Sequence, residues 1–420
     1  MAETLQGIGP RSLGRSDGDE APATPDELSS RLADLCRRMG VTIEIHPGLD
    51  DDAPPLTGDR RERYTLGPEI GHGGGGRVIL ATDRDLRRSV ALKVLAERHA
   101  GDPQRVQAFL EEAVITAGLE HPNIAPVYDL GWSPILGFYY TMKRLSGRTL
   151  VDILDGLRQS DSEEQRSFGL FRALGAFVEL CRAVAHAHQR GVIHSDLKPD
   201  NVIVGEYGEI VVVDWGMAQL LGPTGASQVR AKIRGGTPEY MAPEQFTETG
   251  ATLGVSVDVW ALGVILYELL TLSVPFRGET ADEIGMRVMI EPVTPPAKRA
   301  PARPIPPGIE QICMRALERD LSRRYPTVAE LLGDVEAWLA GTRERMRRAE
   351  QVLHALETAE AVLSPNETLE EELDRALASP DAHASEGEDL EFGRGELLTA
   401  YEQAGAALLR GLEIDREAGP

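Results

Sequence analysis

Polar side chains of three kinds are packed into the run HSDLKPDN at residues 194–201. Asp196 can accept a hydroxyl proton, and Lys198 can neutralise a phosphoryl group during its transfer. Asn201 offers an amide oxygen, and Asp214 follows at the end of the apolar run EIVVVD. Asp214 taken alone also fits a turn, but the two oxygens together predict a site for a hard cation such as Mg²⁺.

A glycine-rich stretch, GHGGGGRV at residues 71–78, is of a kind that lies over phosphate groups. Taken alone, it also fits a dinucleotide-binding fingerprint or a glycine loop without any ligand. A dinucleotide site needs a helix directly after the glycines. Here RVILAT, DRDLRR and SVALKVL indicate a strand, a turn and a strand. The pattern therefore favours a β-hairpin that covers phosphates.

Lys93 lies in the apolar strand pattern VALK, 17 residues after Gly76. A lysine on such a strand either extends to solvent or finds an anion. As the strand partner of a glycine-rich hairpin, it would point its ammonium at the phosphates. Glu112, in the following helix, could hold Lys93 in place, although a solvated helix face is the alternative and Glu111 stands beside it. Lys93 and Lys198 are two of only five lysines among 44 basic residues.

The elements that must position these residues fall into two groups. Short apolar runs separated by turns predict an antiparallel sheet over 64–100, with a helix over 104–119 and a further strand over 138–145. After Leu150 the patterns are mostly helical. We therefore expect an α+β fold with two lobes, a small β-rich lobe over 64–145 and a large α-helical lobe over 146–340.

The flanking segments differ from this central part. Residues 1–63 predict a largely disordered extension with a short helix near 25–40, and residues 341–420 predict an acidic helical extension. The net charge of −23 argues against nucleic acid as a partner. No stretch is apolar enough to span a membrane and no secretory signal is visible. Three distant cysteines favour a reducing compartment, so we expect a cytoplasmic protein.

In order and spacing, these motifs resemble the eukaryotic-type Ser/Thr protein kinases found in bacteria, over residues 64–340. The resemblance implies ATP as the phosphoryl donor, Mg²⁺ as the metal with Mn²⁺ as an alternative, and proteins as substrates. It makes Asp196 the catalytic base, Lys198 the γ-phosphate contact, and Asn201 and Asp214 the metal ligands. The positions that match the nucleotide-binding residues are Ile70, Gly71, His72, Gly73, Gly74, Gly75, Gly76, Arg77, Val78, Ala91, Lys93, Glu112 and Met142.

Downstream motifs extend the resemblance. GTPEYMAPE at 236–244 matches the substrate-docking segment, which contains Thr237 and Glu244. Asp258 matches the helix that anchors the catalytic loop, and Arg324 matches the arginine that pairs with Glu244. The resemblance leaves two other interpretations open. A scaffold without activity would have lost one of the chemical residues, and a small-molecule phosphotransferase generally lacks the docking segment.

The chain departs from the family at Ser195, where many members carry an arginine that receives the activation-loop phosphate. The neutral serine predicts activity without phosphorylation of that loop, in which Thr224 and Ser227 are the candidate acceptors. Trp215 replaces the usual Phe, and Lys143 stands where an acid is common. The acidic C-terminal helices are expected to be largely a solvated structural region. Packing on the large lobe, a contact for a protein partner and the start of a helical-repeat region are the alternatives.

Overall fold

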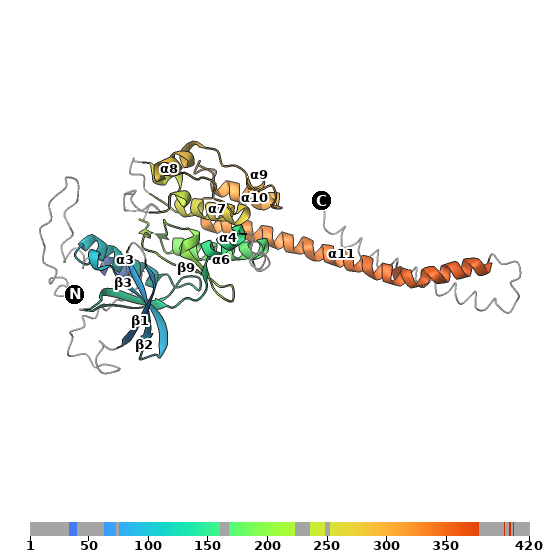
Figure 1. Cartoon of the computed structure of the whole chain (residues 1–420). Helices are drawn as coiled ribbons and strands as arrows, with labels where there is room; N and C mark the ends of the chain where they lie inside the picture. The colour runs from blue at the N-terminus through green and yellow to red at the C-terminus, as the bar shows by residue number, and fades with distance from the viewer. Residues whose placement is uncertain are drawn as a thin grey trace. The chain divides into compact units, whose positions relative to one another are not determined.

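The computed structural model describes residues 33–39, 63–72, 75–133, 135–159, 168–222, 236–247, 253–377, 399, 403–404 and 406. The chain divides into two units, residues 1–335 and 336–420. The first unit contains a sheet followed by a group of helices, so the predicted α+β fold is confirmed (Figure 1).

The sheet has five strands, β1 (Tyr64–His72), β2 (Gly76–Asp83), β3 (Arg88–Leu95), β4 (Val127–Ser133) and β5 (Gly137–Lys143). Their order is β1-β2-β3-β5-β4, and every neighbouring pair is antiparallel. The central strand β3 is the most apolar and the most buried, as a strand covered on both faces must be. Strand β4 was not predicted, because its sequence VYDLGWS mixes polar and apolar residues around an irregular register.

Helix α3 (Pro103–Gly118) follows the 3₁₀ turn η2 (Glu97–His99) and carries Glu112. Asp102 begins it, because its carboxylate accepts the amide protons of Gln104 and Arg105 and Pro103 stands at the first helical position. Its Phe109 ring packs 5.3 Å from the ring of Tyr140 on β5. The predicted helix over 104–119 is confirmed within one residue.

The helical lobe is built around α7 (Ser256–Thr271), in which every residue after Ser256 is buried. A helix that is apolar on all sides can only lie inside a core. The helices that complete this part of the first unit are α4 (Leu150–Arg158), α6 (Leu170–Gln189), α8 (Ala281–Ile290), α9 (Pro296–Arg299), α10 (Pro307–Ala316) and the start of α11 (Val328–Leu377).

Short strands and 3₁₀ turns lie between α6 and α7 and hold the loops of the site. The strands are β7 (Val192–Ile193), β8 (Val202–Val204), β9 (Ile210–Val212) and β10 (Gln219–Leu220), and β8 also pairs with β6 (Arg148–Thr149). The 3₁₀ turns are η3 (Pro199–Asn201), η4 (Pro238–Tyr240) and η5 (Pro243–Phe246). Strand β7 pairs with β10, which joins the start of the run 194–201 to the chain that follows Asp214.

The boundary between the two units falls inside α11, after Val335. Of the helix predicted near 25–40, residues 33–39 are helical and the rest lie outside the described residues. Among the helices that the structure describes, none combines the length and the apolar character needed to cross a bilayer.

Candidate active site

The loop after β7 contains Asp196 and Lys198, and both contact Thr237, a third residue that the sequence singled out. The Nζ of Lys198 donates to the Oδ2 of Asp196 at 2.9 Å and to the Oγ1 of Thr237 at 2.8 Å. The backbone N–H of Thr237 donates to the other oxygen of Asp196 at 3.2 Å. Residues 41 positions apart in sequence therefore share one hydrogen-bonded group. A hydroxyl placed beside Asp196 would find both a proton acceptor and a nearby cation.

The buried carboxylate of Asp258 on α7 holds the backbone of this loop in place. It accepts the backbone N–H groups of His194 at 2.8 Å and of Ser195 at 2.9 Å, and the Nε2 of His188 lies at 2.7 Å. Burial opposes the charge, yet these partners hold the pKa of Asp258 below its ordinary value. Ser195 has φ = 68°, a strained conformation for serine, and the two N–H bonds to Asp258 hold it there.

The two residues expected to hold a metal lie next to each other. The backbone N–H of Val213 donates to the carbonyl of Asn201 at 2.9 Å, so Asp214 begins beside Asn201. Asn201 donates its Nδ2 to the carbonyl of Asp196 at 2.9 Å, which leaves its amide oxygen free to act as a ligand. The carboxylate of Asp214 is 54% exposed. Two oxygen donors of this kind fit Mg²⁺ or Mn²⁺.

Lys93 on β3 and Glu112 on α3 form an ion pair of 2.5 Å, so the helix does supply a carboxylate to this lysine. Lys93 also lies 3.6 Å from the carboxylate of Asp214. Burial by itself would lower the pKa of Lys93, but the two carboxylates hold it above its ordinary value. The lysine is therefore charged, and the pair joins the sheet to the segment that carries Asp214.

The glycine-rich stretch is the connection of the β1–β2 hairpin, with Gly71 opposite Val78 and His72 opposite Arg77. Gly76 lies so close to the backbone of β3 that a side chain there would overlap the carbonyl of Val94. The Ile70 side chain before the loop is half exposed. Gly73 and Gly74 lie outside the described residues, whereas Gly75 begins the described chain again with open space around it.

Ala91 and Met142, the other two nucleotide positions of the sequence analysis, face each other as register partners on β3 and β5. Ala91 is buried and Met142 is half-buried. Because Lys93 lies two residues after Ala91 on β3, both side chains project from the same face of the sheet. The strand thus presents a small residue and a charged one side by side.

Arg324 forms a two-pronged ion pair with Glu244, which lies in the segment predicted to dock the substrate. The Nη1–Oε1 distance is 2.7 Å and the Nη2–Oε2 distance is 3.3 Å. Arg324 is fully buried and its remaining donors bond to the carbonyls of Glu318 and Ser256. The guanidinium also stacks over the Trp260 ring, 5.0 Å from its centre. This pair holds η5 to the core of the helical lobe.

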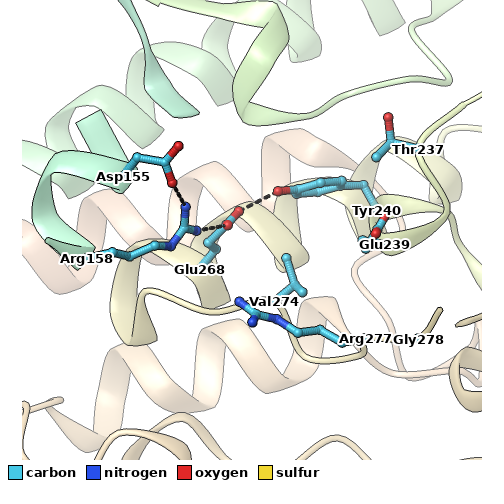
Figure 2. A pocket seen from close by; sticks show the side chains of 9 residues that line it. All are labelled: Asp155, Arg158, Thr237, Glu239, Tyr240, Glu268, Val274, Arg277 and Gly278. Carbon is cyan, nitrogen blue, oxygen red and sulfur yellow. Dashed lines mark hydrogen bonds and ion pairs between the residues drawn. The ribbon is translucent and has the colours of Figure 1, made fainter. Parts of the chain in front are cut away.

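A pocket of about 490 Å³ opens between α4, α7 and η4 (Figure 2). Arg158 of α4 bonds to both Asp155 and Glu268, and Glu268 accepts the hydroxyl of Tyr240 at 2.6 Å. Burial raises the pKa of Glu268, although Tyr240 and Arg158 both favour the carboxylate. Thr237 also lines this pocket, so the pocket adjoins the group formed with Asp196 and Lys198.

Two residues that hold the site were missed by the sequence analysis. Tyr140 on β5 donates its hydroxyl to Glu112 at 2.8 Å, on the same oxygen that contacts Lys93. His188 at the end of α6 bonds to Asp258. A tyrosine in an aromatic strand and a histidine in a helix have no spacing that indicates such partners. Thr224 and Ser227 lie outside the described residues.

The model of the family "Protein kinase domain" matches residues 64–335. The chain therefore belongs to the protein kinase family.

The similar proteins point to one branch of that family. The "Serine/threonine-protein kinase PknD" of Chlamydia felis is 40% identical over 303 residues, which cover 67% of this chain and 32% of that protein. The protein of the same name from Chlamydia caviae is 39% identical, with the same coverage, and that from Protochlamydia amoebophila is 36% identical over 300 residues, or 67% and 30% of the two chains. The chain thus spans about a third of the length of the curated relatives it matches.

Proposed function

We propose that this chain is an active protein kinase that transfers the γ-phosphoryl group of Mg-ATP to Ser or Thr hydroxyls of proteins. The observation that carries the proposal is the convergence of Asp196, Lys198 and Thr237 beside Asn201 and Asp214. The Lys93–Glu112 pair lies against the same Asp214. Lys93 and Lys198, the two cations of the proposed site, are thus each held by a hydrogen bond or an ion pair to another residue.

In this proposal the protein acts mainly by positioning and electrostatics. Lys93 binds the α- and β-phosphates of ATP under the β1–β2 hairpin, and Glu112 keeps its ammonium in place. Asp196 orients the acceptor hydroxyl and takes its proton, while Lys198 contacts the γ-phosphate. Mg²⁺ bound by Asn201 and Asp214 would supply positive charge to the phosphate oxygens.

The experiment is phosphoryl transfer to a generic basic protein, measured with the purified full chain, Mg²⁺ and labelled ATP. Asp196→Asn is expected to reduce turnover by about a thousandfold or more while leaving the affinity for an ATP analogue nearly unchanged, because Asp196 acts on the acceptor. Lys93→Met and Asp214→Asn should reduce turnover to a similar degree. Glu206→Gln, an exposed acid in the turn between β8 and β9, serves as the control. Wild-type turnover in Asp196→Asn would exclude Asp196 as the base.

We also infer that activity does not require a phosphorylated activation segment, the chain from Asp214 to Glu244. The inference is supported by Ser195, whose neutral side chain is buried and replaces a cationic group beside Asp196. An unphosphorylated segment then has less charge repulsion to overcome. Arg230, Lys232 and Arg234 are the bases that could still gather a phosphate.

The test is a double variant, Thr224→Ala with Ser227→Ala, compared with phosphatase-treated wild type. Both are expected to keep most of the steady-state activity toward an exogenous substrate. A drop of about a hundredfold or more in either would contradict the inference, because it would mean that a phosphate is needed to order this segment.

Cytoplasmic signalling in a bacterium is the proposed setting, because the reaction needs ATP and the named relatives are bacterial. Proteins are the proposed substrates. The acidic helices at the C-terminal end are a proposed contact for a protein partner.

A further inference from the structure

The helical segment of residues 33–39, here called the clamp helix, packs against the kinase domain although it lies outside residues 64–335. Leu35 and Met39 are one helical turn apart and only 6% and 4% exposed, so they form a buried face. Arg37 and Arg38 are exposed. A helix this short gains little stability from its own hydrogen bonds, and therefore its contacts must hold it.

The first contact is with the C-terminal end of α3. Gly118 is the last residue of that helix, and Met39 fills the space that a side chain at 118 would take. A β-carbon built on Gly118 would lie 2.7 Å from the Cε, 2.9 Å from the Cβ and 3.2 Å from the carbonyl oxygen of Met39. The first two distances are shorter than van der Waals contact allows, so the two surfaces fit in this arrangement because residue 118 is glycine.

The second contact is with the start of the activation segment. Arg38 donates its Nη2 to the backbone carbonyl of Leu221 at 3.0 Å. The N–H of Leu221 donates in turn to the carbonyl of Gly191 at 2.7 Å, just before β7. Strand β7 leads directly into the loop that contains Asp196. The clamp helix therefore contacts an element of the small lobe and an element of the large lobe at once.

Both contacted elements carry residues of the site. Helix α3 holds Glu112 against Lys93, and Glu112 stands six residues, nearly two turns, before Gly118. Leu221 stands seven residues after Asp214, the other carboxylate near Lys93. Movement of α3 relative to the sheet would separate Glu112 from Lys93 on β3, an ion pair that protein kinases need for catalysis.

We propose that the clamp helix holds α3 and the start of the activation segment in the arrangement that pairs Glu112 with Lys93. Met39 and Arg38 are thus positioning residues for phosphoryl transfer, and the site uses a segment from outside the kinase domain. The proposal rests on the kinase function given above for the effect on turnover. The contact itself does not depend on that function.

The experiment uses the full chain and measures hydrogen–deuterium exchange of α3 together with steady-state kinetics. Met39→Ala removes the side chain from one surface, and Gly118→Ala places a methyl group on the other. Each is expected to speed the exchange of the α3 amides and to lower kcat about tenfold, an ordinary size for coupling between distant sites. The KM for the protein substrate should stay near its wild-type value, because the clamp helix acts on the nucleotide side.

A double-mutant cycle tests whether the two residues act through each other. With Met39 reduced to alanine, the Cε that collides with the new methyl group is gone. Gly118→Ala should then cost less than it does in the wild type, so the two effects on exchange and kcat should not add. Met39→Leu, which keeps the apolar bulk, should restore slow exchange and most of kcat.

Arg37→Ala is the matched control for Arg38→Ala. The two arginines are neighbours on an exposed face, but Arg37 bonds to Asp34 within the same segment. Arg38→Ala should speed the exchange of amides near Leu221, whereas Arg37→Ala should not.

The outcomes separate the alternatives. Unchanged α3 exchange in Met39→Ala and Gly118→Ala would overturn the contact. Faster exchange with wild-type kcat would overturn the positioning role and leave the clamp helix as a source of stability only. If the wild-type chain transfers no phosphate at all, the proposed function fails, while slow exchange in wild type and fast exchange in Met39→Ala would still support the contact.

Discussion

At the scale of single residues, the site depends on charges that are buried together with their partners. Asp258, Arg324 and Glu112 are each less than a tenth exposed, and each makes an ion pair or several hydrogen bonds. A buried charge is tolerable only in this condition, since desolvation alone costs several kcal/mol. Substitution of one partner therefore destabilises the protein mainly because it leaves the other partner as a buried charge without compensation.

Arg324→Met should lower the free energy of unfolding by about 3–5 kcal/mol, because it leaves Glu244 without its cation in a largely desolvated place. The melting temperature and the activity should fall together, since Glu244 belongs to the docking segment. Arg323→Met changes an exposed neighbour and is the control. If thermal denaturation of the two variants gave equal midpoints, the pair would contribute nothing to stability.

We expect His121 and His186 to make the folded protein sensitive to acid. Their rings lie 5.1 Å apart, and burial lowers both pKa values from 6.5, helped for His121 by the charge of His186 and for His186 by that of Arg190. The Nδ1 of His121 also accepts the N–H of Asn123. Between 6.5 and the lowered values the unfolded chain binds more protons, so stability is complete above this window and is lost as pH falls through it.

The variant His186→Phe keeps a ring beside His121 and removes one titrating group. The Nε2 of His186 has no hydrogen-bond partner among the described residues, so little bonding is lost. Between about pH 7.5 and about pH 5.5, the melting temperature should fall less in His186→Phe than in wild type. His354→Asn, exposed on α11, is the control and should behave as wild type. Identical pH profiles of wild type and His186→Phe would contradict the assignment.

At the scale of elements, η4 is held in place by two helices that are distant in sequence. Arg158 of α4 bonds to Glu268 of α7, and Glu268 bonds to Tyr240 of η4 (Figure 2). Thr237, directly before η4, contacts Asp196 and Lys198. The orientation of η4, in the segment proposed to receive the substrate, is therefore coupled to the α4–α7 ion pair.

Arg158→Met should raise the KM for a protein substrate by about tenfold, a change similar to the loss of one hydrogen bond to a charged group. The KM for ATP should change much less, because the residues proposed to bind the α- and β-phosphates, Lys93 and the β1–β2 hairpin, lie on the sheet. Arg277→Met is the control, because it removes a charge from the same pocket but keeps the hydrogen bonds among Arg158, Glu268 and Tyr240. Equal KM values for protein substrate in Arg158→Met and wild type would show that the network does not position η4.

At the scale of the whole molecule, the family model matches residues 64–335, and the chain has a flank on each side of this region. The C-terminal flank is a separate unit, and the relatives are about three times as long as the matched region. The N-terminal flank belongs to the first unit and contributes residues 33–39 to it. The clamp helix is the described part of the N-terminal flank that contacts the kinase domain, through Met39 and Arg38.

The sequence alone was enough to predict α3 and four of the five strands of the sheet, and to single out the residues proposed to carry the chemistry. These features have local causes, because apolar periodicity, an N-capping Asp102 and the spacing within HSDLKPDN are all read over a few positions. The prediction of a β-hairpin at the glycine-rich stretch is confirmed for the same reason.

Only the tertiary structure showed which residues support that chemistry. Tyr140, His188 and Arg158 reach their partners across 28, 70 and 110 positions of sequence, and no local pattern records such contacts. The sequence does not indicate the contact of Met39 with Gly118 either, since a glycine at the end of a helix usually indicates only a cap. The residues proposed for the chemistry can be recognised from residue types at short spacing. The residues that hold them in place are decided by packing, which depends on how the whole chain folds.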